Sequence, residues 1–265
     1  MAASPFSLVI LGLALAKIIY PAYNKQGKGG KLLIALFSPL IRVLLKVISR
    51  ICVQRLCSKS FHPGYSYVVL TPLYFSSAFM FRILQADLGS LQSIAVLGII
   101  HGASEVIERS IMVVIDHISH VICDRRSAPW GSFRTPHRER LMADIAIMSM
   151  LYESTAIVSV NGFLYMYQFI YFQEDSLLKL LRSFAITTSV QLVIEWFFTS
   201  VSLAIETRYM NIAVMAVWQR RLKRHISVAI VAATGLALWT TKYFLPIAHH
   251  HYNTFYNQTC KMPFT

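Results

Sequence analysis

Long runs of apolar residues, separated by short polar or charged stretches, dominate the sequence. The two longest runs are neighbours, at 141–172 and 176–209, with only Gln173, Glu174 and Asp175 between them. A helix of about 20 apolar residues is long enough to cross the hydrocarbon of a bilayer. The pattern therefore predicts two long membrane-spanning helices, and the short turn requires that they run antiparallel and side by side.

Five shorter apolar runs are also long enough to form helices. The run at 4–20 predicts an anchor helix, and the runs at 65–84, 88–107 and 227–247 predict further spans, the second of which continues as a helix to Cys123. Together with the two long helices, these runs predict an all-α, polytopic membrane bundle of about six spans. We expect an N-terminal part at 1–60 and a transmembrane bundle at 61–265.

The run at 31–53 differs from the others because it is amphipathic. Arg42, Lys46 and Arg50 are spaced by four residues, so they form one basic stripe on an otherwise apolar helix. We expect this helix to lie in the membrane interface, with the three cations binding the anionic headgroups of the cytosolic leaflet. The alternative is that it spans, which would place Arg42 near the middle of the bilayer at a cost of about 2.5–3.5 kcal/mol.

Composition supports a membrane protein and excludes other classes. The chain is 55% hydrophobic and 14% charged, whereas soluble domains carry about 25% charged residues. A membrane β-barrel would require short segments of alternating hydrophobicity, which the sequence does not contain. The cysteines form no CxxC pair and no disulfide framework.

The formal net charge of +13 is explained by loop position better than by a nucleic-acid partner. The stretches 21–60, 124–140 and 208–226 hold eight, five and five of the 25 lysines and arginines. Basic residues concentrate in cytosolic loops of membrane proteins. The distribution therefore predicts cytosolic basic loops at 124–140 and 208–226, places both chain ends on the opposite side, and implies no nucleic-acid partner.

One face of the predicted helix at 176–209 is polar along its whole length. The spacing of its polar residues is 3, 4, 4, 3 and 4, which keeps them on one side: Thr188, Gln191, Glu195, Thr199, Ser202 and Glu206. Such a face must contact protein or water rather than lipid. It either lines a substrate pathway or joins two helices by hydrogen bonds, which is a common use of Ser, Thr and Gln in membrane bundles.

Glu153 and Glu195 lie at matched depths in the two long helices. Each is about 16 Å from the predicted cytosolic end of its helix, at 1.5 Å per residue. Asn161 shares the face of Glu153. Two close carboxylates in a medium of low dielectric constant cannot both stay ionised, so we expect the pair to share one proton. This arrangement predicts proton or cation handling.

The predicted helix from Leu88 adds further ionisable residues on one face, including His101 and Glu105. His101 would lie near the depth of the two glutamates, whereas Glu105 would lie closer to the interface, within reach of Arg109. A histidine among carboxylates is also a metal-binding combination, but the paired Glu-x-x-His motifs of di-iron bundles are absent. The sequence has no GxSxG, HExxH or Walker motif and implies no cofactor.

These features favour a small transporter or channel. Glu153 and Glu195 would couple transport to protons or cations, with the pathway lined by His101, Glu105, Asn161, Thr188, Gln191, Thr199 and Ser202. One alternative is a non-catalytic scaffold, which would assemble as a homo-oligomer or with partner subunits of a membrane complex. The other is a metal-dependent membrane enzyme that acts on lipid, with His101 and the glutamates as ligands.

Overall fold

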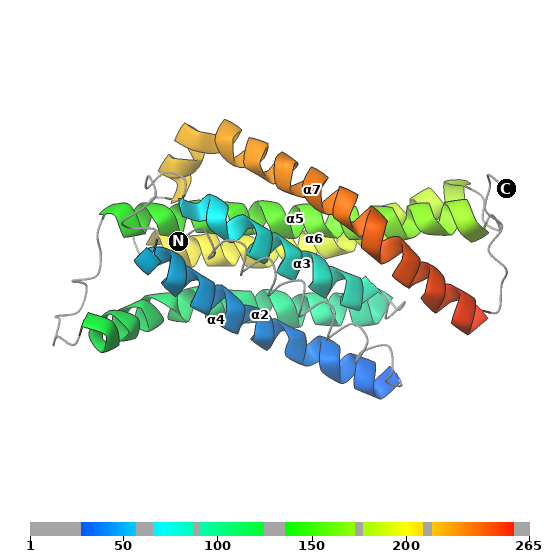
Figure 1. The fold of residues 1–265 in the computed structure, drawn as a ribbon, viewed down its shortest axis with the longest axis horizontal. Coiled ribbons are helices and arrows are strands. Elements are labelled where there is room, and N and C mark those ends of the chain that lie inside the picture. Colours follow the sequence, from blue (N-terminus) through cyan, green and yellow to red (C-terminus); the bar gives the residue numbers. More distant parts are fainter. Residues whose placement is uncertain are drawn as a thin grey trace.

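The described part of the protein is entirely helical. The computed structural model describes residues 28–56, 66–86, 91–124, 136–172, 177–208 and 214–256, and over these residues it contains six α-helices, one short 3-10 helix and no strand (Figure 1). The all-α prediction is confirmed. The anchor helix predicted at 4–20 lies outside the described residues.

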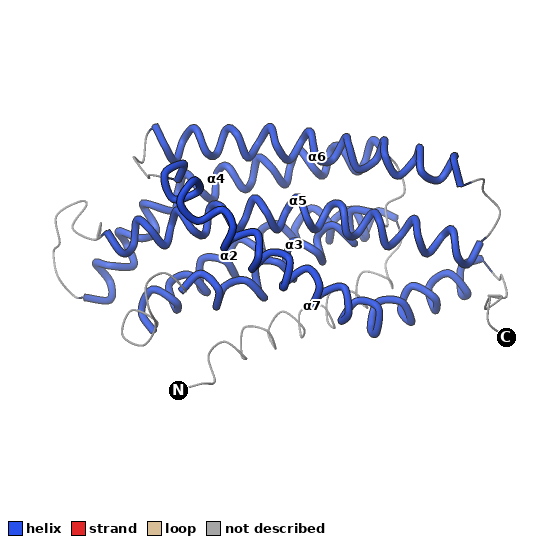
Figure 2. The backbone as a smooth tube through the Cα atoms, turned by 90° about the horizontal axis from the view of Figure 1, so that it is seen from above, coloured by secondary structure: helices blue, strands red, loops and turns tan. Residues whose placement is uncertain are grey.

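The six helices form an elongated bundle in which successive helices reverse direction (Figures 1 and 2). Their bounds are α2 Lys28–Leu56, α3 Thr71–Ala86, α4 Leu91–Asp124, α5 Pro136–Phe172, α6 Leu177–Arg208 and α7 Val214–Tyr256, and the 3-10 helix η1 is Ser66–Leu70. As a result, α2, α4 and α6 end at the end of the bundle where η1, α5 and α7 begin.

The two long helices agree closely with the sequence pattern. The second, α6, differs from its predicted range by one residue at each end. The first, α5, ends at Phe172 as predicted but begins at Pro136, five residues early. The fixed φ of proline suits the first helical turn, and Glu139 in that turn interacts favourably with the positive end of the helix dipole.

A predicted loop is part of a helix in the structure. The basic stretch at 208–226 was expected to be a cytosolic loop, but α7 begins at Val214 and runs through it without interruption. The physical reason is that Gln-Arg-Arg-Leu-Lys-Arg contains only strong helix formers and neither glycine nor proline. Of the other predicted loop, at 124–140, only the part at 125–135 lies outside α4 and α5, and it is not among the described residues.

The structure corrects the expected position of the basic stripe on α2. Arg42, Lys46 and Arg50 are 5%, 2% and 2% exposed, so they lie inside the bundle and not among lipid headgroups. The opposite, apolar face of the helix is exposed, through Leu33, Phe37, Leu40, Ile41, Leu44 and Ile48. The prediction separated the two faces correctly but placed the cations on the outside, because it did not include the carboxylates that neighbouring helices offer them.

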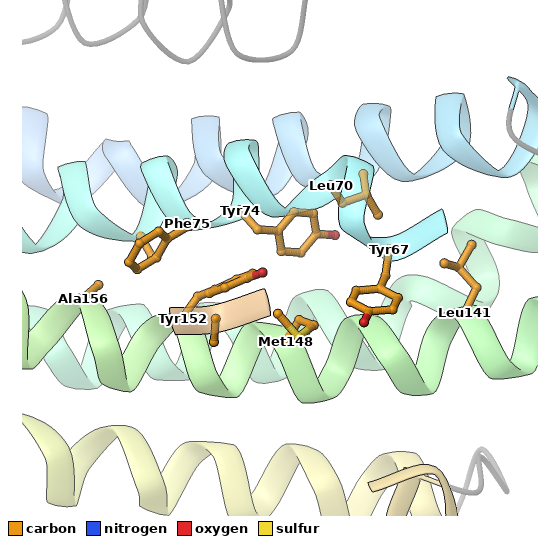
Figure 3. Close-up of a cluster of buried hydrophobic side chains, with 10 residues drawn as sticks. Tyr67, Leu70, Tyr74, Phe75, Leu141, Met148, Tyr152 and Ala156 are labelled. Carbon is orange, nitrogen blue, oxygen red and sulfur yellow. The ribbon is translucent and has the colours of Figure 1, made fainter. Parts of the chain in front are cut away.

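The centre of the bundle is α5, which has an apolar side and a polar side. On the apolar side, residues of η1, α3, α5 and α7 form a buried hydrophobic cluster, much of which Figure 3 shows. Tyr152 belongs to this cluster and donates a hydrogen bond to Thr71 Oγ1 at 2.7 Å. Its neighbour Glu153 points to the polar side, because consecutive side chains of a helix are about 100° apart.

Among the helices that the structure describes, two are long and apolar enough to cross a membrane. They are the part of α5 at Glu139–Phe169 and the whole of α6, Leu177–Arg208. The two differ in their surroundings, because most of the apolar window in α5 is buried inside the bundle, whereas only 11% of the window in α6 is buried. Most of α6 therefore presents apolar side chains to the outside of the molecule.

Candidate functional site

The polar side of α5 faces a set of buried charged residues from five helices. We call the first group, which surrounds Glu153, the first ionic cluster; it comprises Arg42, Arg82, His101, Glu153 and Glu195. The second ionic cluster lies about one helical turn away along α2 and α4; it comprises Lys46, Glu105, Glu108, Arg109 and Glu206. Every member of both clusters is at most 9% exposed.

In the first ionic cluster, one arginine binds both glutamates of the predicted pair. Arg82 Nη2 donates to Glu195 Oε2 at 2.5 Å and to Glu153 Oε2 at 3.3 Å. Its other terminal nitrogen donates to Gln85 Oε1 at 2.9 Å, which holds the guanidinium in place. A side chain of α3 therefore joins α5 to α6 at the position where the sequence predicts the two carboxylates to meet.

A second arginine completes the first ionic cluster. Arg42 forms an ion pair with Glu153 and donates from Nη1 to His101 Nε2 at 2.5 Å. A guanidinium only donates hydrogen bonds, so His101 Nε2 must accept. The ring is therefore neutral, with its proton on Nδ1. Phe81 stacks on the imidazole, with the ring centroids 4.1 Å apart, and fixes its orientation.

The second ionic cluster connects α2, α4, α5 and α6. Lys46 Nζ lies 3.3 Å from Glu105 Oε1 and 3.6 Å from Glu108 Oε2. Arg109 Nη2 lies 3.4 Å from Glu105 Oε1 and its Nη1 lies 3.5 Å from Glu206 Oε1. Ser149 of α5 donates to Glu105 Oε1 at 3.0 Å. Glu105 is thus paired with Arg109 of its own helix, which the sequence placed within its reach, and also with Lys46 of α2.

Several other polar residues of α6 bind α5 or the first ionic cluster, or are buried beside them. Asn161 Nδ2 donates to Thr188 Oγ1 at 3.2 Å and to Gln191 Oε1 at 3.3 Å. Thr199 donates to Glu195 Oε1 at 3.4 Å, and Ser202 is 1% exposed. Asn161, Thr188 and Gln191 are therefore joined directly by hydrogen bonds between the two helices.

The expected pair of carboxylates sharing one proton requires correction. Glu153, Glu195 and His101 do come together, with one ligand atom of each within 4.8 Å of the others. However, Arg42 and Arg82 bind the same carboxylates. Two positive charges compensate the two negative ones, so both glutamates can stay ionised in this arrangement.

Arg42 and Arg82 also determine whether this group of residues is suited to a metal ion. The ligand atoms of His101, Glu153 and Glu195 are close enough together to hold a cation. A metal would have to take Glu153 and Glu195 from Arg82, and would then lie beside two guanidinium groups. The donor set does not suit a divalent metal, because the carboxylate charges it would use are already neutralised.

Sequence reasoning missed two parts of this interior. Arg82 was not among the predicted site residues, although as the one charged residue in the apolar stretch at 60–86 it could have been singled out. Asp144 and His225 form a separate buried pair between α5 and α7, with His225 Nε2 at 3.0 Å from Asp144 Oδ1. Both residues are fully buried, but the histidine stood in a basic stretch that was predicted to be a loop.

Glu195 illustrates how the fold assembles this site. Its partner Arg82 lies 113 positions earlier in the chain, and the side chain of an arginine on α3 points back toward the helix start, into the bundle.

Comparison with known proteins does not identify the arrangement. No protein-family model, no curated protein and no solved structure matches this chain.

Proposed function

We propose that the protein is a multi-pass membrane transporter in which Glu153 and Glu195 take up and release protons. The first support is the distribution of polarity, which combines many buried charges with many exposed large apolar side chains. Five Arg and Lys side chains and five Glu side chains are buried, whereas large apolar side chains are exposed on α2, α4, α6 and α7. Lipid-facing bundles show this distribution because charges in the membrane turn toward the bundle interior.

The outward face of α4 shows the pattern clearly. Its exposed apolar residues recur over almost the entire helix: Leu91, Val96, Ile99, Ile107, Ile111, Val114, Ile118 and Ile122. Monomeric soluble proteins rarely expose apolar patches larger than a few hundred Å². A stripe of this length, next to the exposed apolar face of α2, supports lipid as the surroundings of the bundle.

Helix length and direction support six spans, from α2 to α7. Each α-helix other than α3 has at least 29 residues, and α3 continues η1 to give 21 residues in total. A span requires about 20. α2, α4 and α7 carry more charge than apolar spans normally do, whereas α3 carries only Arg82. In α2 and α4, many of the charged residues belong to the buried clusters. With six alternating helices, the basic stretches beside Leu56, Asp124 and Arg208 lie at one end, which fits a cytosolic side.

The observation that carries a transport function is that one arginine is shared between two glutamates of different helices. When Glu195 takes up a proton, its ion pair with Arg82 is lost, whereas the pair between Arg82 and Glu153 remains. The position of Arg82 on α3 then depends on which glutamate is ionised. An element with two alternative sets of partners is what couples proton binding to a movement of helices. The hydrogen-bonded residues around it, from Asn161 to Ser202, would line the route.

The proposal can be tested with purified protein in liposomes that contain a pH-sensitive dye. Potassium chloride at equal concentration on both sides, with valinomycin, holds the membrane potential at zero, and an external acid step supplies the gradient. We expect wild-type protein to dissipate the gradient faster than protein-free liposomes do. Replacing both glutamates, Glu153→Gln and Glu195→Gln, should return the rate to that of protein-free liposomes.

Glu139→Gln is the matched control. This substitution removes a carboxylate from the same helix, α5, but at its half-buried first turn. It should leave the rate unchanged. A wild-type rate equal to that of protein-free liposomes, or an undiminished rate in the double variant, would refute the proposal. Absence of flux together with a stoichiometric partner subunit after detergent purification would establish the scaffold alternative instead.

A further inference from the structure

We infer that a small monovalent anion is transported together with the proton, and that Arg82 is its binding residue. This inference rests on the proposed function and adds the class of ion that accompanies the proton. It is carried by three observations on the first and second ionic clusters: their charge balance, the kind of polar atom left without a partner, and the unequal pairing of the two glutamates.

The buried charges of the described helices balance. The cations are Arg42, Lys46, Arg50, Arg82 and Arg109, and the anions are Glu105, Glu108, Glu153, Glu195 and Glu206. Asp144 and His225 form a pair of their own. A net charge is costly in a medium of low dielectric constant. A proton or a metal cation that binds alone adds one positive charge beside Arg42 and Arg82, whereas a proton with a monovalent anion leaves the sum unchanged.

Three of the four unpartnered polar atoms of the first ionic cluster are N–H groups, and the fourth, Glu153 Oε1, forms an ion pair with Arg42. Arg42 Nε, Arg82 Nε and His101 Nδ1 are buried and have no hydrogen-bond partner among the described residues. Each of these atoms is a donor, since Arg42 donates to the other ring nitrogen of His101. Both oxygens of Glu153 contact an arginine. The cluster therefore has spare donors, which an anion satisfies and a cation does not.

The two glutamates are held unequally, which indicates where each ion binds. Glu153 is paired with Arg42 and Arg82 and lies 3.6 Å from His101, whereas Glu195 has Arg82 and the hydroxyl of Thr199. Protonation of Glu195 therefore removes one of the two carboxylates bound to Arg82. The anion then binds the Arg82 guanidinium in place of the Glu195 carboxylate.

The surroundings of Glu195 contain the other groups that influence its protonation. Arg82 on α3 contacts Glu195 directly, and His101 on α4 and Glu153 on α5 each have an atom within 4.8 Å of a Glu195 oxygen. Arg42 on α2 binds Glu153 and His101, and the second ionic cluster lies about one helical turn farther along α2 and α4. Together with Arg50 and the second ionic cluster, Arg42, Arg82, Glu153 and Glu195 form the balanced set of buried ions. When both ions bind, a proton goes from solvent to a Glu195 oxygen and an anion goes to Arg82, so the net charge of the buried clusters does not change.

The test uses the same liposomes at equal pH inside and outside. Chloride is high outside and replaced by gluconate inside, potassium is equal, and valinomycin holds the potential at zero. We expect the chloride gradient to drive protons inward and acidify the interior beyond the level in protein-free liposomes. Glu195→Gln and Arg82→Gln should each abolish this acidification, whereas Glu139→Gln and Arg208→Gln, which alter residues outside both clusters, should retain it.

A sodium gradient of the same size, with equal chloride, should drive no protons. If chloride drives nothing or sodium drives protons, while an acid step is still dissipated, the inference fails and the proposed function stands. If neither assay shows proton movement, both fail. Where Arg82→Gln does not fold, as judged by size-exclusion chromatography, the charge-balanced Arg82→Gln/Glu195→Gln variant replaces it, and the comparison of chloride with sodium on wild-type protein decides alone.

Discussion

Substituting Gly102 by alanine tests the packing that holds the first ionic cluster together. Gly102 follows His101 on α4, and a Cβ atom built on it would lie 2.5 Å from Phe198 Cγ and 2.9 Å from Phe198 Cβ on α6. Carbon atoms in contact are normally about 3.5–4.0 Å apart. Rotation about χ1 can move Cγ and the ring of Phe198, but its Cβ atom is fixed to the backbone, so α4 and α6 would have to separate by about 0.6–1 Å.

Two opposing terms set the size of the effect. Overpacking of a well-packed interior costs about 1–3 kcal/mol, and replacing glycine by alanine in a helix gains up to about 1 kcal/mol. Gly162 on α5 is the matched control, because its added Cβ meets nothing within 4 Å. Gly162→Ala should therefore gain stability. Because this gain is common to both variants, they should differ in free energy of unfolding by the overpacking term, about 1–3 kcal/mol.

The measurement is the thermal midpoint of each purified variant in the same detergent. At about 2–4 °C per kcal/mol for a protein of this size, we expect Gly102→Ala to melt on the order of 2–12 °C below Gly162→Ala. Gly98→Ala should fall between them, because its nearest neighbour, Gln85 Nε2, is 3.4 Å away. A midpoint of Gly102→Ala equal to or above that of Gly162→Ala would refute the close approach of α4 and α6.

Three further predictions concern the polar contacts between helices. Arg42→Gln leaves Glu153 without one of its two cations and should cost about 3–5 kcal/mol of unfolding free energy. The Arg42→Gln/Glu153→Gln double variant should lose clearly less than the summed losses of the two single variants. Additive losses would show that the pair does not interact. Asn161→Ala removes two hydrogen bonds to α6 and should cost about 1 kcal/mol, more than Val158→Ala on the exposed side of the same helix; equal losses would contradict these bonds. His225→Ala leaves the buried Asp144 without its imidazole and should also cost about 3–5 kcal/mol, whereas Lys223→Ala, which is exposed, should leave the melting midpoint unchanged.

The sequence was sufficient for those features that depend on one helix at a time. The lengths of α5 and α6 followed from their apolar runs, because few polar residues interrupt either. The split of α2 into a basic and an apolar face followed from the four-residue spacing of Arg42, Lys46 and Arg50. The proximity of Glu153 and Glu195 followed from the short turn between their helices, which makes them antiparallel neighbours with matched depths.

Features that depend on how helices rotate against each other could not be predicted. A basic stripe on α2 suits lipid headgroups as well as buried carboxylates, and only the positions of α4 and α5 distinguish the two. For the same reason Arg82 was not assigned to Glu195, since no local pattern relates residues that far apart. The error at 208–226 had another cause, because charge density was used there in place of helix propensity.

The distribution of the buried charges along the chain has a consequence for biosynthesis. The four cations Arg42, Lys46, Arg50 and Arg82 lie in α2 and α3, whereas the five buried glutamates lie in α4, α5 and α6. At about 5–20 residues per second, the ribosome needs roughly 10–30 s to proceed from the end of α2 to Glu195. For a chain that enters a membrane, the first two helices are positively charged throughout this interval. In such a chain, these two helices would be stable in the hydrocarbon only together with the later helices that carry the carboxylates.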